Sequence, residues 1–338
     1  MAAMEATATS FIIYISIITA SLSYCYFLSS KIPKGIYRFI SLIPIFYIFT
    51  VLPLRCSSVF TTAIAASFTT WLTNFKLIRF AFDLDQSPFH PSDSLLRFIT
   101  VTSLPIESKS VYSQPPDRFR FKLGFQIIVF SVLVRLVLNH RHQFHPYLVL
   151  ILYCGLLFLT IDIVAGVINA LLFLFTGLEL EPSFDHPYLA ISLQDFWGRW
   201  NLMVTNTLRH TIYKPVRSTF SGHEWAPLAG VLTSFMVSGL MHELFVYQLS
   251  RAAPTWEMTW FFVLHGVSVV AEMIVKRRVA GRRWRLPMFM RWLLTMGFVA
   301  TTGMWLFFPP LTRNGLDAKI LQEYTSVIDF ITGHIFYS

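Results

Sequence analysis

His242 is the residue with the clearest chemical potential, because it lies inside a long apolar segment, 227–249, of membrane-spanning length. Entering that segment at Pro227, His242 is about 15 residues, or roughly 22 Å, deep. An ionisable side chain in hydrocarbon costs a few kcal/mol, so each such residue is a functional candidate. A neutral imidazole in a dry chamber could take the proton of a hydroxyl group, as a general base does. The other intramembrane candidates are Arg135, Asp162, Glu243, His265 and Glu272.

The helix expected around His242 carries small residues at intervals of four, namely Gly230, Ser234 and Ser238. This spacing fits two interpretations. In one, Ser238 and its neighbours line a narrow chamber beside His242, and Ser238 contacts substrate. In the other, the small residues form a helix-packing face and His242 only hydrogen-bonds across it.

The remaining polar residues indicate structural roles more than metal or redox chemistry. His242 and Glu243 begin an H-E pair, but a zincin would need His at position 246, where Val246 stands. His265 and Glu272 share a helix face and supply only two ligands. We therefore expect no metal site and no cofactor. Asp162 is expected to bond to a neighbouring helix, and Arg135 to reach the membrane surface.

A second candidate region is the stretch 192–217, which reads SLQDFWGRWNLMVTNTLRHTIYKPVR. Ser192 and Asp195 fit a capping box, which predicts a helix that starts at Leu193. Helical spacing gathers aromatic and apolar residues on one side of it and polar residues on the other. The pattern predicts one amphipathic helix in the membrane interface, with its aromatic residues at headgroup depth. Asn201 falls on the border between the two faces.

The elements that position these residues are predicted to be membrane-spanning helices. Of the 338 residues, 54% are hydrophobic and 13% are charged, about half the charged fraction of a soluble domain. The mean hydropathy is +0.57. These values exclude a soluble enzyme. We predict an all-α integral membrane protein with about eight spans in one domain, 1–338: 11–30, 39–54, 58–80, 121–139, 147–178, 227–249, 257–275 and 292–310.

The net charge of +9 is explained by the placement of basic residues in short loops. If the N-terminus is lumenal, 21 of the 27 Lys and Arg residues fall in the cytosolic loops 31–38, 76–122, 179–226 and 276–291. This bias follows the positive-inside rule, provided that 147–178 crosses only once. Anionic lipid headgroups are thus the expected partners, and nucleic acid is not.

Two motifs together resemble a known family. The run LQDFWGRWNLMVTNTLRHTIYKPVR (193–217), followed by VSGLMHELFVYQL (237–249), is similar to plant wax synthases, which are long-chain-alcohol O-fatty-acyltransferases of the membrane-bound O-acyltransferase family. The family pattern usually reads DFWGRRWN, whereas this chain has Arg199 alone. The resemblance implies that His242 is catalytic and that Asn201 assists it.

The same resemblance implies acyl-CoA as co-substrate, a fatty alcohol as acceptor, and residence in the endoplasmic reticulum. The expected reaction is direct attack of the alcohol on the thioester, without an acyl-enzyme. Two alternatives remain open, namely a sterol or another lipid alcohol as acceptor, and a multispan lipid transporter or scaffold. The substrate-binding residues expected from these motifs are Asp195, Trp197, Arg199, Trp200, Ser238, Lys214 and Arg217.

Overall fold

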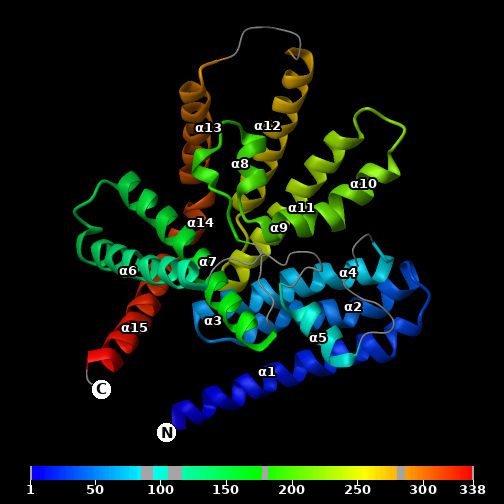
Figure 1. The fold of residues 1–338 in the computed structure, drawn as a ribbon, viewed down its shortest axis with the longest axis horizontal. Coiled ribbons are helices and arrows are strands. Elements are labelled where there is room, and N and C mark those ends of the chain that lie inside the picture. Colours follow the sequence, from blue (N-terminus) through cyan, green and yellow to red (C-terminus); the bar gives the residue numbers. More distant parts are fainter. Residues whose placement is uncertain (1, 85–93, 106–115, 177–181, 280–285, 337–338) are drawn as a thin grey trace.

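The structure is a computed structural model that describes residues 2–84, 94–105, 116–176, 182–279 and 286–336, and within these ranges the regular elements are all helices (Figure 1). The longer helices are α1 (Ala2–Phe27), α2 (Ile36–Val51), α6 (Pro116–His140), α7 (Pro146–Thr176), α11 (Ala226–Ser250), α12 (Glu257–Val279), α13 (Met288–Thr302) and α15 (Leu316–Phe336). The shorter ones are α3 (Val59–Ala65), α4 (Asn74–Phe82), α5 (Leu95–Ser103), α8 (Leu193–Arg199), α9 (Leu202–Leu208), α10 (Lys214–Thr219) and α14 (Pro309–Thr312).

Seven of the described helices are long and apolar enough to cross a membrane. They are Ile12–Lys31, Ile36–Arg55, Lys122–His140, Pro146–Leu174, Ala226–Ser250, Glu257–Val279 and Met288–Thr312. The prediction of an all-α integral membrane protein is therefore confirmed. Seven of the eight predicted spans coincide with these helices.

The eighth predicted span, 58–80, is helical but is not among the seven helices that are long and apolar enough to cross a membrane. It comprises α3, a π-helical segment (Ala66–Thr73, η3) and α4, which follow one another without a break. Lys76 and Arg79 are both buried within it. It lies antiparallel to α2, because Gly35 N–H donates to the carbonyl of Ala81 at 2.8 Å and, beside them, Lys34 pairs with Asp83 at 2.8 Å.

The long run 147–178 forms one continuous helix, α7, of 31 residues. At 1.5 Å per residue it is about 46 Å long, which is more than enough for one crossing of a bilayer core of about 30 Å. The single crossing on which the predicted orientation depends is thus supported. Asp162 accepts a hydrogen bond from Gln126 at 2.5 Å and pairs with Lys122 at 3.1 Å, which joins α7 to α6 as expected.

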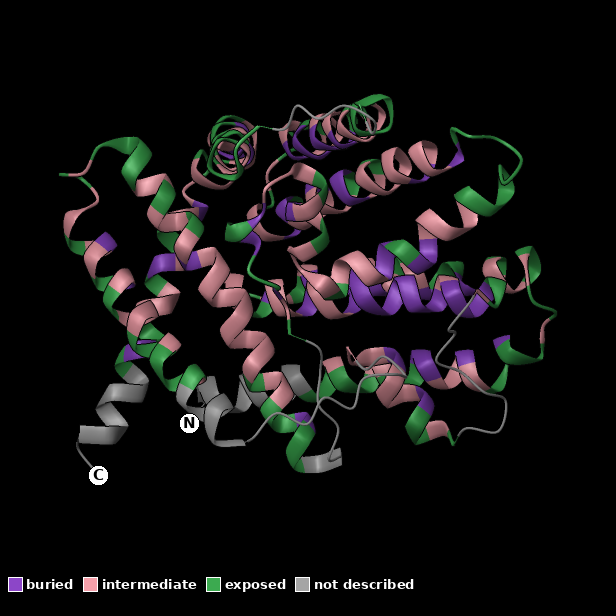
Figure 2. Ribbon diagram, turned by 45° about the horizontal axis from the view of Figure 1, so that its top comes forward, coloured by how far each residue is buried: buried purple, intermediate pink, exposed green. Residues whose placement is uncertain are grey.

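Buried residues gather on the central helices, whereas α6 and α7 are mostly half-buried or exposed (Figure 2). One apolar cluster joins α1, α2, α4 and α5, and a second joins α6, α7 and α15. A third, small cluster brings Trp71 and Phe75 onto Leu208. This third cluster connects the buried helix 59–82 to the segment that contains Asn201.

Helices α11 and α12 pack closely because glycines stand where they meet. A Cβ atom on Gly239 would lie 3.0 Å from the backbone of Thr259, and one on Gly266 would lie 2.7 Å from Phe235 Cβ. Glu243, also on α11, accepts hydrogen bonds from Trp256 N–H at 2.7 Å and Thr259 N–H at 3.2 Å. Its carboxylate therefore caps the N-terminus of α12. Both features fix α12 against the helix that carries His242.

Candidate active site

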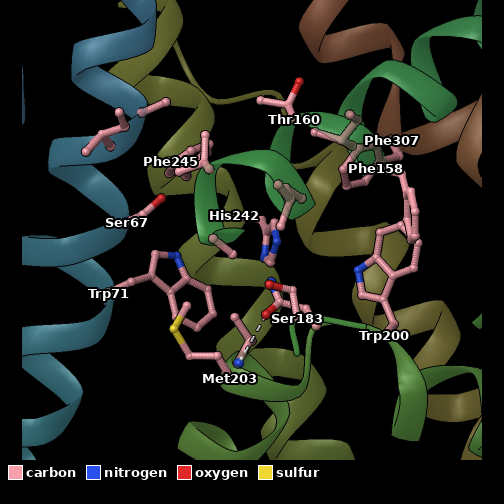
Figure 3. A pocket seen from close by; sticks show the side chains of 18 of the residues that line it. Ser67, Trp71, Phe158, Thr160, Ser183, Trp200, Met203, His242, Phe245 and Phe307 are labelled. Atoms are coloured by element: carbon pink, nitrogen blue, oxygen red, sulfur yellow. Dashed lines mark hydrogen bonds between the residues drawn. The ribbon is translucent and has the colours of Figure 1, made fainter. Parts of the chain in front are cut away.

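A large cavity of about 1550 Å³, called the chamber below, lies between the buried helix 59–82, α5, α7, the α8–α9 segment, α11, α12, α13 and α15. Typical small-molecule sites measure about 300–1,000 Å³. Most of its lining side chains are apolar or aromatic. Figure 3 shows His242 within it, between Trp71 and Trp200. The chamber is therefore wide and apolar enough to hold more than one hydrocarbon chain.

The His242 ring is held in one orientation by its surroundings. Its Nδ1 atom lies 2.8 Å from the carbonyl oxygen of Ser238. A carbonyl can only accept, so Nδ1 carries the proton and Nε2 of the neutral ring bears a lone pair. Trp71 meets the ring edge-on at 5.5 Å, and Phe262 lies against it at 4.2 Å between ring centroids. The arrangement leaves a fixed basic nitrogen on a ring that lines the chamber.

The small-residue stripe on α11 packs against protein. None of its three members, Gly230, Ser234 and Ser238, lines the chamber, whereas the neighbouring His242 does. Gly230 meets Tyr213, whose ring carbon would lie 2.8 Å from an added Cβ. Ser238 is buried and contributes its carbonyl to His242. The interpretation that the stripe lines the chamber is wrong, and the packing interpretation holds for Gly230.

The prediction of one amphipathic helix over 193–217 is also wrong. Helix α8 ends at Arg199, and Trp200 is extended with φ −82° and ψ 125°. Asn201 then takes the left-handed conformation, with φ 43° and ψ 74°, and starts α9. The break is tied to the preceding segment, because Leu202 N–H donates to Ser183 O at 2.8 Å and Asp185 N–H to Arg199 O at 3.0 Å. Helical phase is therefore not carried from Arg199 to Asn201.

The aromatic residues of this segment pack against other aromatic residues of the protein. Trp197 lies 5.3 Å from Phe235 and 5.5 Å from Phe262 between ring centroids, and its indole N–H donates to His265. Trp200 stacks on Phe196 at 5.4 Å. Both tryptophans line the chamber, as does Asn206 of α9.

Asn201 reaches the chamber through this break. Its side-chain oxygen accepts a hydrogen bond from Val204 N–H at 3.3 Å, which caps α9. Its amide nitrogen makes no hydrogen bond with the described part of the chain and so is free to donate. Because both residues line the chamber, the structure brings Asn201 and His242 to one cavity.

The charged residues expected to bind substrate lie outside the chamber. Arg199 bonds Asp195 through Nε at 2.7 Å and pairs with Asp185 at 3.8 Å. Burial raises the pKa of Asp195, but the hydrogen bonds from Arg199 and Ile191 N–H outweigh it and leave that pKa below its usual value. Lys214 and Arg217 are on α10, away from the cavity lining.

Two further ionisable residues on α12 have structural partners. His265 is fully buried and is bonded on both ring nitrogens, by Trp197 and Thr302. Glu272 accepts hydrogen bonds from Leu193 N–H at 2.9 Å and Gln194 N–H at 3.3 Å, and it pairs with Lys276. Glu272 thus caps α8. No group of three His, Cys, Asp or Glu residues suited to a metal ion occurs in the part of the chain that the structure describes.

Sequence reasoning missed Trp71 and Glu323. Trp71 was hidden in an apolar run, where nothing in its spacing points to His242. Glu323 on α15 lines the chamber and accepts hydrogen bonds from Ser58 Oγ at 2.9 Å, Val59 N–H at 2.7 Å and Phe60 N–H at 2.7 Å. It caps the buried helix from more than 260 residues away, which no local pattern could reveal.

Comparison with known proteins agrees with this geometry. Residues 180–264, which include both motifs, match the membrane-bound O-acyl transferase family. The chain is 41% identical over 321 residues to the probable long-chain-alcohol O-fatty-acyltransferase 3 of Arabidopsis thaliana, covering 92% of each chain. It is 40% identical over 332 residues to the long-chain-alcohol O-fatty-acyltransferase of Simmondsia chinensis, covering 94% of each.

An intramembrane histidine in a large apolar chamber, together with these relatives, defines a membrane-embedded acyltransferase. The chain belongs to the membrane-bound O-acyltransferase family, in the group of the long-chain-alcohol O-fatty-acyltransferases.

Proposed function

We propose that this protein transfers a fatty acyl group from acyl-CoA to the hydroxyl of a long-chain alcohol and so forms a wax ester. The observation that carries the proposal is the fixed tautomer of His242, whose Nδ1–H is bound by Ser238 O at 2.8 Å. A basic Nε2 is thereby kept on a ring that lines a chamber of about 1550 Å³. The names of the Arabidopsis and Simmondsia relatives supply the acceptor class.

The proposed chemistry is a single acyl transfer. His242 Nε2 takes the hydroxyl proton as the alcohol oxygen attacks the thioester carbon. The new C–O bond forms, the C–S bond breaks, and CoA leaves as a thiolate that recovers the proton from the imidazolium. The products are an ester and free CoA, and no acyl-enzyme is formed.

Asn201 is proposed to donate its free amide N–H to the oxygen that becomes negative during the attack. Removing one such donor typically costs about 10²–10³ in rate. Trp197 and Trp200 would contact the acyl chain or the alcohol chain, because both line the chamber. Lys214 and Arg217 remain proposed contacts for the CoA phosphates or for lipid headgroups, at the cytosolic face of the endoplasmic reticulum.

The decisive test is ester formation by microsomes that contain His242→Ala. We expect ester formation to be abolished while expression and membrane insertion remain normal. His223→Ala is the matched control, since His223 is exposed in the loop before α11 and does not line the chamber. Ester formation near the wild-type rate by His242→Ala would remove the base assignment.

The acceptor is tested separately by supplying labelled acyl-CoA with a fatty alcohol, a sterol or a diacylglycerol to the wild-type protein. We expect label chiefly in wax ester. Faster labelling of sterol ester or triacylglycerol would assign a different lipid alcohol to the same chamber.

A further inference from the structure

His265 is a second buried histidine, 23 residues after His242, that the proposed chemistry does not use. Its ring is fully buried in α12 and is bonded on both sides. The indole nitrogen of Trp197 lies 3.1 Å from Nδ1, and Thr302 Oγ1 lies 2.9 Å from Nε2. Thr302 in turn bonds the carbonyl of Phe298 at 2.7 Å.

The chemistry of these groups gives the chain of hydrogen bonds one direction. An indole N–H can only donate, so His265 Nδ1 must accept and carries no proton. Thr302 Oγ1 donates its hydrogen to the carbonyl of Phe298, so its oxygen accepts a hydrogen bond from the N–H at Nε2 of His265. The chain therefore runs from Trp197 through a neutral His265 to Thr302. Neither ring nitrogen of His265 is left for substrate, so His265 is not a second base.

The two ends of this chain belong to different walls of the chamber. Trp197 is in α8 and lines the chamber. Thr302 is the last residue of α13, and the π-helical segment Gly303–Phe307 (η6) follows it directly. Three residues of that segment also line the chamber, namely Gly303, Met304 and Phe307.

The same ring is connected to His242 through aromatic contacts. Phe262 lies 5.5 Å from Trp197 and 4.2 Å from His242 between ring centroids. Phe261 lies 4.3 Å from His265 and 5.3 Å from Phe307. A movement of the Trp197 indole would therefore alter both the width of the chamber and the packing of His242.

We propose that His265 is a positioning residue that holds the Trp197 wall and the Gly303–Phe307 wall at a fixed separation, and thereby sets which chain lengths the chamber accepts. This inference rests on the proposed function, because it takes the hydrocarbon chains of the substrates to lie between these walls. It assigns to three residues, Trp197, His265 and Thr302, one shared effect on selectivity.

The test compares chain-length profiles with a series of saturated alcohols at fixed acyl-CoA, and then with a series of acyl-CoAs at fixed alcohol. Thr302→Val removes one hydrogen bond at nearly constant shape, Trp197→Phe removes the other and also shortens a side chain that lines the chamber, and His265→Leu removes both. A fitted pocket discriminates one methylene by about 10-fold or more. We expect the kcat/KM ratio between chains that differ by two carbons to fall by at least about 10-fold in all three variants, with a smaller loss in Thr302→Ser and His265→Gln.

Thr295→Val is the matched control. Thr295 lies on the same helix, has the same 5% exposure as Thr302, and likewise bonds its own helix, at Arg291 O, but the hydrogen bonds of His265 go to Trp197 and Thr302 and not to it. A uniform loss of rate with an unchanged profile, or equal effects of Thr302→Val and Thr295→Val, would overturn the proposal. If His242→Ala stayed active while these profiles changed, the proposed base would fail and the positioning role of His265 would stand.

Discussion

At the scale of single residues, Asn201 has two structural roles in addition to its proposed chemical role: it adopts a left-handed backbone conformation and it caps α9. Its φ of 43° lies in the left-handed region, which Asn tolerates better than most residues, and its side chain caps α9. A substitution by alanine would remove the cap, strain the backbone and delete the amide donor together. Glycine is the informative replacement, because it accepts the left-handed backbone without strain.

We predict that Asn201→Gly lowers kcat by about 10²–10³, the usual cost of an oxyanion donor, while the KM for acyl-CoA changes little. Loss of the cap to glycine should cost only a few tenths of a kcal/mol in stability. Asn201→Ala should lose the same activity and about 1–2 kcal/mol of stability in addition. Steady-state kinetics and thermal unfolding in detergent separate the two effects. A glycine variant with nearly wild-type kcat would leave Asn201 a structural role alone.

At the scale of helices, glutamates cap three N-termini near the chamber, and two of the three come from distant parts of the chain. Glu243 caps α12, Glu272 caps α8 and Glu323 caps α3. The caps from Glu272 and Glu323 each join two elements that lie far apart in the sequence, whereas Glu243 joins two consecutive helices. The sequence predicted that Glu243 and Glu272 lie within spans, but their partners, 13 and 79 residues away, come from the tertiary fold.

Periodicity was a sound guide to elements and a poor guide to their interruptions. The apolar runs predicted α7 and α11 closely, because a hydrocarbon environment demands long unbroken helices. The break at Trp200–Asn201 was missed, because one left-handed residue and two hydrogen bonds from the segment 183–185 decide it. His242 could be identified from sequence because it is an ionisable residue within an apolar run. Trp71 and Phe262, which contact its ring, could not be identified, because only the tertiary fold brings them to it.

The close contact of α11 and α12 leads to a prediction at this scale. Gly266→Ala would place a methyl group 2.7 Å from Phe235 Cβ, which is too near the backbone to move aside freely. Overpacking of this kind typically costs about 1–3 kcal/mol. We expect a lower unfolding temperature in detergent and a lower rate of ester formation, because Phe235 also packs on Trp197.

Gly297→Ala is the control for this substitution. Gly297 is inside α13, and an added Cβ would meet no atom within 4 Å. Alanine favours a helix over glycine by about 1 kcal/mol, so this variant should be as stable as the wild type or more so. Equal behaviour of the two variants would show that the α11–α12 contact tolerates a wider separation.

At the scale of the whole molecule, the buried helix 59–82 determines how many times the chain crosses the membrane and on which side each later loop lies. Its 24 residues reach about 35 Å, enough to cross the hydrocarbon core. Its far end is bound to the start of α2 through Gly35 and Ala81, and α2 is itself long and apolar enough to span. A helix that returns beside a spanning helix must cross as well, and its polar residues are sheltered by protein instead of facing lipid.

We therefore predict eight crossings with a lumenal N-terminus, and single cysteines can test this. In a background with serine at the three native cysteines, Leu84→Cys and Ser221→Cys should react with a membrane-impermeant maleimide in intact microsomes, whose cytosolic face is outward. Ser57→Cys and Thr255→Cys should react only after permeabilisation, because 59–82 and α11 each separate one tested pair. Labelling of Ser57→Cys and Leu84→Cys from the same side would mean that 59–82 does not cross, and reversal of all four would invert the orientation that the basic loops predict.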